Sequence, residues 1–205
     1  IKKWSYSGSI PSLLDTIQCS KATGLLGLSG QQGAFASAHI QALLANTDRP
    51  IVFPLSNPTS SVEADPANIL QWSDGNAIVA TGSPFEPVNY KGITFPIGQG
   101  NNAFIFPGLG FGSILCGAKK ISHNMVIAAS IALADYTGEK HASNGTVYPP
   151  VSDLQEVSIF VTARVIECAV KEKLTSMKFS SISEIIDFVQ KNFWRHSDRP
   201  LDQGH

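Results

Sequence analysis

Residues 50–60 read PIVFPLSNPTS, an apolar run that gives way to a polar, asparagine-bearing turn. A short apolar run bounded by turn residues is typical of a buried strand in a parallel sheet. Pro58 stops that strand, because proline cannot continue the hydrogen-bonded ladder of a central strand. The sequence therefore predicts a strand over residues 50–55 that ends in a turn containing Asn57.

The residues on both sides repeat this pattern. Residues 24–28 (GLLGL) and 77–81 (AIVAT) are further short apolar runs, and helices are predicted over 9–17, 34–45 and from Asp65-Pro66 to Trp72. This alternation indicates right-handed crossovers and an α/β fold. We expect part of a doubly wound, Rossmann-like parallel sheet with helices on both faces.

The rest of the chain is predicted to be helical. Residues 102–117 form a nearly continuous apolar run that should be buried, and residues 124–136 read as a packed helix. Apolar residues recur on one face from Leu154 to Cys168, which indicates a long amphipathic helix. Ser181 and Glu184 resemble a capping box for a last helix that ends near Trp194. Residues 139–145 are polar and predicted to form an exposed loop.

A second asparagine turn, GQGNN over residues 98–102, precedes the run AFIFPG. An asparagine amide offers two donors and one acceptor, so it can hold a carboxylate, a hydroxyl or a carboxamide without adding charge. We expect both turns to follow neighbouring strands of one parallel sheet, where ligands collect beyond the carboxyl ends. Asn57 should then lie near Asn101 and Asn102, over a floor for a small, oxygen-rich ligand.

Composition excludes several classes of function. The chain has 205 residues and a formal net charge of -1, which argues against a nucleic-acid partner. No apolar run reaches the ~18 residues that a membrane span requires. Cys19, Cys116 and Cys168 are odd in number and lack metal-type spacing, which favours reduced thiols in a cytoplasmic protein.

Several motifs together resemble the malic enzymes. They appear in family order over nearly the whole chain: residues 27–35, 49–60, 80–85, 99–102, 106–108, 121–122 and 148–150. The closing Asn192-Phe193-Trp194 is most similar to the bacterial, NAD-linked branch.

The resemblance implies two regions: residues 1–102 as the C-terminal half of an NAD-binding domain, and residues 103–205 as a helical C-terminal segment packed on it. It also implies oxidative decarboxylation of (S)-malate to pyruvate and CO2 with NAD and Mg2+ or Mn2+, in a cytoplasmic homodimer or homotetramer. A malolactic enzyme, which converts malate to lactate and CO2, is the alternative within the family. A non-catalytic binding or assembly remnant is the alternative outside it.

The resemblance also assigns binding residues. Asn57, Asn101 and Asn102 would contact the substrate, and Ser29, Gly30, Ser56, Asn57 and Asn102 would contact NAD. The residues themselves leave structural alternatives open. Residues 27–33 could be a tight strand-to-helix turn, Asn57 could cap a turn, and one of Asn101 and Asn102 could cap a helix.

The family's other functional motifs have no match here. These are a catalytic lysine and tyrosine, a Glu-Asp-Asp metal set and the Gly-x-Gly-x-x-Gly fingerprint. We therefore expect the C-terminal part of a longer enzyme, inactive alone and without catalytic or metal-binding residues of its own. The glycines of residues 108–112 (GLGFG) are predicted to pack helices, because the third glycine of a dinucleotide loop would fall at Ser113. Glu63 and Asp65 are predicted to lie at a helix start.

Overall fold

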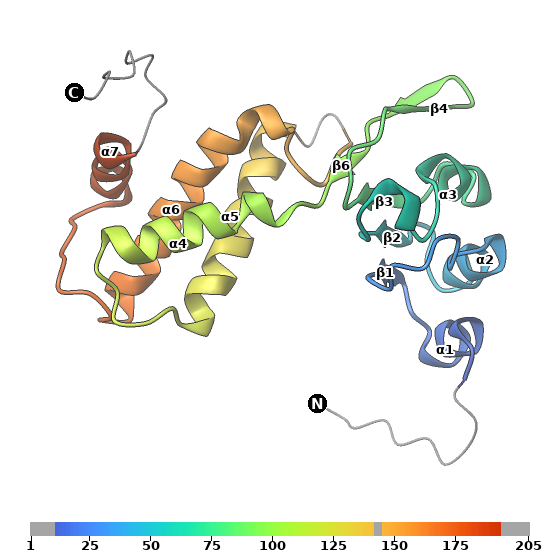
Figure 1. The fold of residues 1–205 in the computed structure, drawn as a ribbon, viewed down its shortest axis with the longest axis horizontal. Coiled ribbons are helices and arrows are strands. Elements are labelled where there is room, and N and C mark those ends of the chain that lie inside the picture. Colours follow the sequence, from blue (N-terminus) through green and yellow to red (C-terminus); the bar gives the residue numbers. More distant parts are fainter. Residues whose placement is uncertain (1–10, 142–144, 194–205) are drawn as a thin grey trace, which may run out of the picture. The chain divides into compact units, whose positions relative to one another are not determined.

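The computed structural model describes residues 11–141 and 145–193 (Figure 1). Its helices and strands are α1 Leu13–Ser20, β1 Gly24–Gly27, α2 Ser37–Leu44, β2 Ile51–Pro54, α3 Pro66–Trp72, β3 Ile78–Thr81, β4 Val88–Tyr90, β5 Ile93–Phe95, β6 Gly98–Gln99, α4 Phe106–Leu115, α5 His123–His141, α6 Leu154–Lys171 and α7 Ile182–Asn192. The chain divides into two compact units. The first holds the described residues up to Asn101 together with Tyr136–Val151, and the second holds Asn102–Asp135 and the described residues from Ser152 onward. The division into domains 1–102 and 103–205 stays a prediction.

The first unit contains a four-stranded parallel sheet in the order β1-β2-β3-β6. Leu25 lies opposite Val52, and Thr81 lies opposite Gln99. The predicted α/β fold with a parallel sheet is therefore confirmed. Strand β6 was not predicted, because it has only two residues and no apolar run of its own. The strands before the two asparagine turns are not neighbours as predicted, since β3 lies between β2 and β6.

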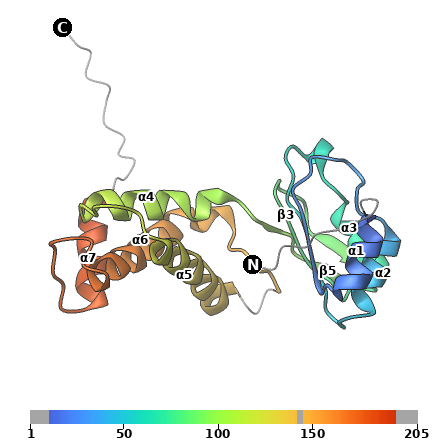
Figure 2. The same cartoon turned by 90° about the horizontal axis from the view of Figure 1, so that it is seen from below.

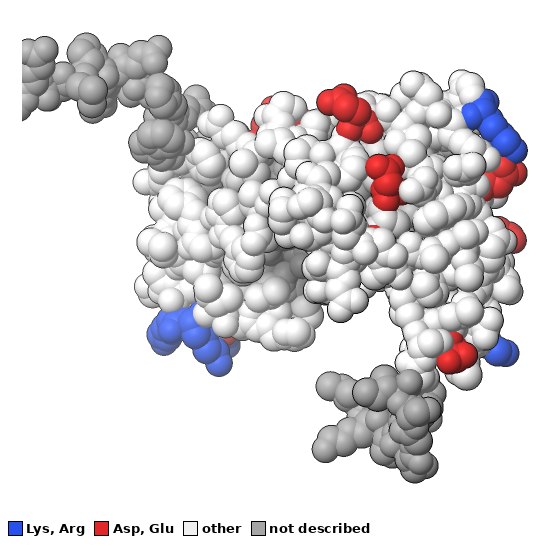
Figure 3. Space-filling view, turned by 45° about the vertical axis from the view of Figure 1, so that its right-hand side comes forward, with Lys and Arg blue, Asp and Glu red and all other residues white. Residues whose placement is uncertain are grey.

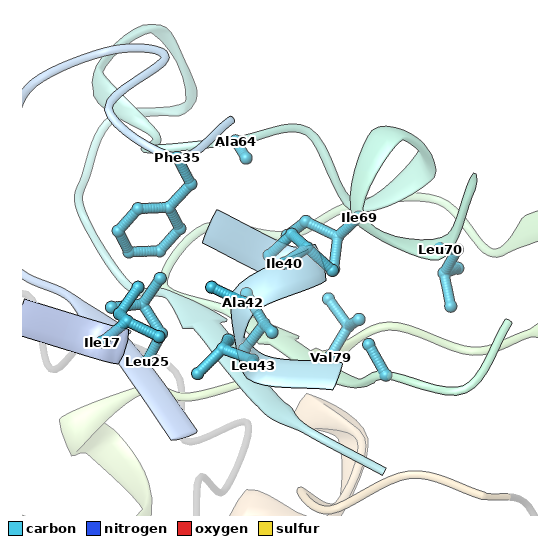
Figure 4. Close-up of a cluster of buried hydrophobic side chains, with 12 residues drawn as sticks. Ile17, Leu25, Phe35, Ile40, Ala42, Leu43, Ala64, Ile69, Leu70 and Val79 are labelled. Carbon is cyan, nitrogen blue, oxygen red and sulfur yellow. The ribbon is translucent and has the colours of Figure 1, made fainter. Parts of the chain in front are cut away.

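The core of this unit lies between the sheet and helices α1, α2 and α3 (Figure 4). Side chains alternate across a strand, so in β1 Leu25 is buried among these helices while Leu26 is 59% exposed. Ile40 and Leu43 of α2 are fully buried. On the other face of the sheet, the ring of Phe53 meets the ring of Tyr148 with centroids 6.2 Å apart.

Capping residues set the helix ends of the first unit. Helix α1 begins after Ser12, whose hydroxyl accepts from the Asp15 N–H at 3.1 Å, so it starts and ends later than the predicted range of 9–17. Asp65 caps α3 by accepting from the Ala67 N–H at 2.8 Å, which confirms its predicted place at a helix start. The peptide bond between Asn57 and Pro58 is cis.

The structure adds an antiparallel hairpin of β4 and β5, for which the sequence predicts no strands. Its two turn residues, Lys91 and Gly92, both have positive φ angles, 49° and 79°. Two such residues favour the tight hairpin turn whose twist matches that of the flanking strands. The strands have three residues each, too few to give a clear alternating pattern.

In the second unit α4 runs along α6 (Figures 1 and 2). A Cβ atom at Gly108 would lie 2.7 Å from Cγ1 of Val161, so only glycine lets the two helices approach this closely. The helix-packing interpretation is confirmed for Gly108 and Gly112, whereas a Cβ atom at Gly110 would meet nothing within 4 Å. The expectation that residues 102–117 are buried throughout is wrong, because Phe106 and Ile114 are 61% and 81% exposed. A helix packed on one side leaves its other face open.

The ends of the later helices bear on two predictions. Helix α5 extends to His141, so residues 139–141 are helical rather than part of an exposed loop, and residues 142–144 lie outside the described part. Helix α7 begins after Ser181, whose hydroxyl accepts from the Glu184 N–H at 3.2 Å, as predicted. It ends at Asn192, and Trp194 lies outside the described residues.

The surface drawn in Figure 3 carries few Lys, Arg, Asp and Glu side chains. Within the described ranges, no helix combines the length and the apolar character needed to cross a membrane.

Candidate functional site

The carboxyl ends of the four parallel strands form one edge of the sheet. Backbone hydrogen bonds continue past the strand ends: the Leu55 N–H donates to the Gly27 carbonyl at 2.9 Å, and the Gly100 N–H donates to the Thr81 carbonyl at 2.7 Å. The loops after β1, β2, β3 and β6 are therefore held side by side. The turns containing Asn57 and Asn101 lie on this same edge, as a parallel sheet requires.

Asn57 is exposed at the end of β2, and its side chain is oriented by Ser83. The Ser83 hydroxyl donates to the Asn57 Oδ1 atom. Within the described part of the chain, no hydrogen bond is made by the Asn57 Nδ2 group. Both amide donors are thus available to an acceptor on a ligand.

Gly82 allows the turns after β2 and β3 to approach closely. A Cβ atom at this position would fall 2.1 Å from the Leu55 carbonyl oxygen and 3.2 Å from Nδ2 of Asn57. The Gly82 carbonyl in turn accepts from Nε2 of Gln99 at 3.3 Å, which joins β6 to the same group of loops. Any side chain larger than hydrogen would push the Asn57 turn away from the edge.

The two adjacent asparagines fall into different units. Asn101 is half-buried at the end of the first unit, and its N–H donates to the Gln99 carbonyl at 3.0 Å. Asn102 begins the second unit in a 3-10 helix, Asn102–Phe104, with its own carbonyl accepting from the Ile105 N–H at 3.0 Å. A shared ligand for Asn57, Asn101 and Asn102 stays a prediction.

Ser29, Gly30 and Ser56, three predicted cofactor residues, are brought together by Glu63. The Glu63 Oε1 atom accepts from the Ser29 N–H at 2.8 Å, from the Ser29 hydroxyl at 2.9 Å and from the Ser56 hydroxyl. The Gly30 N–H donates to the Ser56 hydroxyl oxygen at 2.9 Å. The loops after β1 and β2 are thereby tied to one carboxylate.

Glu63 does not lie at a helix start, so that prediction is wrong. Its side chain is completely buried, 0% exposed, and points at the serines instead. Burial alone would raise the pKa of the Glu63 carboxyl, but hydrogen bonds from Ser56 and Ser29 outweigh it and hold the pKa below its usual value. The signal that could have revealed this is the pair of apolar neighbours, Val62 and Ala64, which are both buried.

A cavity of about 350 Å³ opens beside β6 in the first unit, lined by Phe85, Gln99, Tyr148 and several prolines. The Tyr148 ring covers Gly100, where a Cβ atom would lie 3.2 Å from the ring carbons. Burial raises the pKa of the Tyr148 hydroxyl. This residue was not predicted to be near the site, because nothing in its local sequence links it to the end of β6.

Residues that could bind a metal do not gather in the described ranges. Among residues 11–141 and 145–193, no group of three or more His, Cys, Asp or Glu side chains is placed to hold a metal ion.

Comparison with known proteins identifies relatives for most of the chain. The family model described as malic enzyme, NAD binding domain, matches residues 1–170. The chain is 41% identical over 195 residues to an NAD-dependent malic enzyme of Acinetobacter baylyi, covering 95% of this chain and 34% of the relative. It is 44% identical over 196 residues to an NAD-dependent malic enzyme of Shewanella frigidimarina, with the same coverage.

Solved structures show the same relationship. A malic enzyme from Entamoeba histolytica superposes with a TM-score of 0.72 at 26% identity, covering 89% of this chain and 34% of that chain. A malic enzyme from Pyrococcus horikoshii shares the fold, with a TM-score of 0.67 at 24% identity over 87% of this chain and 36% of that chain. The chain thus spans about a third of the length of the relatives it matches.

Proposed function

The chain belongs to the malic enzyme family, and on that premise we propose that it is part of an NAD-dependent malic enzyme that converts (S)-malate to pyruvate and CO2. Two features support the proposal. Relatives named NAD-dependent malic enzyme match along 95% of the chain. The polar residues of the site also lie at the sheet edge where parallel α/β folds bind their ligands.

The loops at this edge fit a nicotinamide cofactor. When bound, NAD accepts a hydride from C2 of malate. Asn57 would donate its free amide hydrogens to the carboxamide of the nicotinamide or to a malate carboxylate, while Ser83 keeps its carbonyl turned away. Gly82 lets the turn after β2 pack against the turn after β3, which keeps this amide at the sheet edge.

The remaining roles are divided between this chain and groups outside it. Asn101 and Asn102 would help to orient malate, and Asn102, Ser29, Gly30 and Ser56 would line the cofactor site. The general base, the general acid and the ligands of Mg2+ or Mn2+ would come from outside these 205 residues. The contribution of this chain is placement, because holding two reactants in the correct geometry removes much of the entropic barrier.

Within the site, the observation that carries the proposal is the free amide of Asn57 at the sheet edge. We expect Asn57→Ala in the complete enzyme to lower kcat/KM for malate about tenfold to a hundredfold. The reason is that an unpaired polar group on a bound ligand costs about 1–3 kcal/mol. Asn68→Ala is the matched control, because Asn68 is an exposed asparagine in α3.

The assay follows NADH and pyruvate from (S)-malate with Mn2+, together with the melting temperature of each variant. Equal amounts of NADH and pyruvate are the expected products. Lactate without net NADH would contradict the proposal and indicate a malolactic enzyme. An unchanged kcat/KM in Asn57→Ala would remove Asn57 from the site.

We also propose that the complete enzyme is a cytoplasmic homodimer or homotetramer. Sedimentation of the complete enzyme as a monomer at assay concentration would contradict the assembly.

A further inference from the structure

Among the described residues, Glu63 is the side chain that forms hydrogen bonds with side chains of both the loop after β1 and the loop after β2. Three of its hydrogen bonds converge on one oxygen, Oε1. The other oxygen, Oε2, faces the Ser56 N–H at 3.4 Å. The carboxylate therefore fixes Ser29 on one loop and Ser56 on the next.

Burying a carboxylate costs free energy, because the charged group loses its hydration. No Lys, Arg or His among the described residues forms an ion pair with Glu63, so hydroxyl and amide donors alone replace its hydration. The chain also leaves space for it: a Cβ atom at Gly27 would fall 2.5 Å from Oε2 and 2.6 Å from the carboxyl carbon. Removing a donor or filling that space disturbs a buried charge whose partners among the described residues are these hydroxyl and amide donors alone.

We propose that Glu63 is a positioning residue of the cofactor site, which holds Ser29 and Ser56 so that the adjoining Asn57 meets the nicotinamide dinucleotide. The inference rests on the proposed function, because it assigns NAD to this edge of the sheet. Ser56 immediately precedes Asn57, and its hydroxyl both donates to Glu63 and accepts from Gly30. Loss of the carboxylate thus removes the hydrogen bonds that orient the Ser29 and Ser56 side chains.

A purely structural role predicts a different result from a positioning role. If Glu63 only stabilised the fold, its variants would melt at lower temperature but bind cofactor normally while folded. If it positions the loops, folded variants bind cofactor more weakly. The defect should also depend on Ser29, through which Glu63 acts.

The test is a fluorescence titration of NADH into the complete enzyme, well below the melting temperature of each variant. We expect Glu63→Ala to raise the dissociation constant about tenfold, the change that loss of a charged hydrogen bond gives. Glu63→Gln should be milder, about threefold, because it keeps one carbonyl acceptor. Asp65→Asn is the matched control, since Asp65 lies two residues away, contacts neither serine and only caps α3.

Ser29→Ala provides a second, gentler variant if the Glu63 variants fail to fold. It removes one hydroxyl from the carboxylate and leaves the Ser29 N–H in place. We expect the effects of Ser29→Ala and Glu63→Gln on NADH affinity to be less than additive, because both act on the same contact. Fully additive effects would overturn a role of Glu63 through Ser29.

The two proposals fail separately. Wild-type NADH affinity in Glu63→Gln, Glu63→Ala and Ser29→Ala overturns the positioning role even if malate is turned over normally. An enzyme that binds NADH but produces none from malate overturns the proposed function, while the titration still tests Glu63. Failure of the wild-type enzyme to bind NADH overturns both.

Discussion

Glu63 makes the first unit sensitive to acid, because its hydrogen bonds favour the ionised carboxylate over the neutral acid. Its pKa in the folded chain lies below the ordinary value of 4.5. A carboxyl with a depressed pKa stabilises the fold fully above its unfolded pKa, and that contribution is lost as the pH falls through the folded pKa. We expect Glu63→Gln, which cannot titrate, to lack this part of the acid dependence.

The measurement is urea unfolding of wild type and Glu63→Gln from neutral pH down to below 4.5. The variant should be less stable at neutral pH by about 1–3 kcal/mol, because the carboxamide places a donor against the Ser56 N–H. The difference between the two proteins should shrink as the pH falls. A constant difference would show that the charge of Glu63 contributes nothing.

Gly27 offers an independent approach to the same carboxylate. Gly27→Ala places a methyl group 2.5 Å from Oε2 of Glu63, so the side chain has to leave its hydrogen bonds. We expect a loss of about 1–3 kcal/mol in the free energy of unfolding. Gly24→Ala in the same strand is the control, because its Cβ would meet Ile51 at an ordinary contact distance of 3.5 Å. Equal stability of the two variants would contradict the close contact at Gly27.

Single residues of the site were predictable to different degrees. Ser56 and Asn57 were placed at a strand end because an apolar run stops at a proline. Glu63 could not be distinguished from Asp65, since acids just before a helix suit its dipole and capping in either case. Only the fold shows that one of them points into the core and the other caps α3.

At the scale of helices, α4 packs closely on α6 because the face of α4 that meets α6 carries glycine. A Cβ atom at Gly108 would lie 2.7 Å from the Val161 side chain, whereas a Cβ atom at Gly110 would meet nothing within 4 Å. Alanine favours a helix over glycine by about 1 kcal/mol, so Gly110→Ala should stabilise the chain. Gly108→Ala should be about 1–3 kcal/mol less stable than Gly110→Ala, because overpacking opposes that gain. Urea unfolding compares them, and equal midpoints would contradict the packing.

Elements with their own sequence pattern were predicted, and elements held by their neighbours were not. Strands β1, β2 and β3 are apolar runs between turn residues, and α6 has a regular apolar face. Strand β6 is two residues long, and it is defined by its parallel pairing with β3, in which Thr81 lies opposite Gln99. The last turn of α5 is polar and so gives no apolar helix pattern. It is held by Lys140, one turn after Tyr136, whose ammonium group lies 4.8 Å from the centroid of the Tyr136 ring.

At the scale of the whole molecule, the family was recognisable from the sequence because its motifs keep their order along the chain. The comparisons confirm that recognition over 95% of the chain, and they match it to 34% of each relative. The relatives it matches are therefore about three times as long as this chain. In our proposal this chain positions the substrate and the cofactor, and the rest of the enzyme supplies the base, the acid and the metal ligands.

The isolated 205-residue chain should accordingly produce no NADH from (S)-malate, NAD and Mn2+. The reaction needs a base for the C2 hydroxyl, a metal to polarise the new carbonyl and an acid for the enol, and no matching motif occurs in this sequence. Circular dichroism and a cooperative melt should first show that the chain is folded, so that inactivity is not mistaken for unfolding. The complete enzyme, assayed in parallel, should be active. NADH formation by the folded, pure chain would mean that its own residues supply the chemistry, and the division of roles would be wrong.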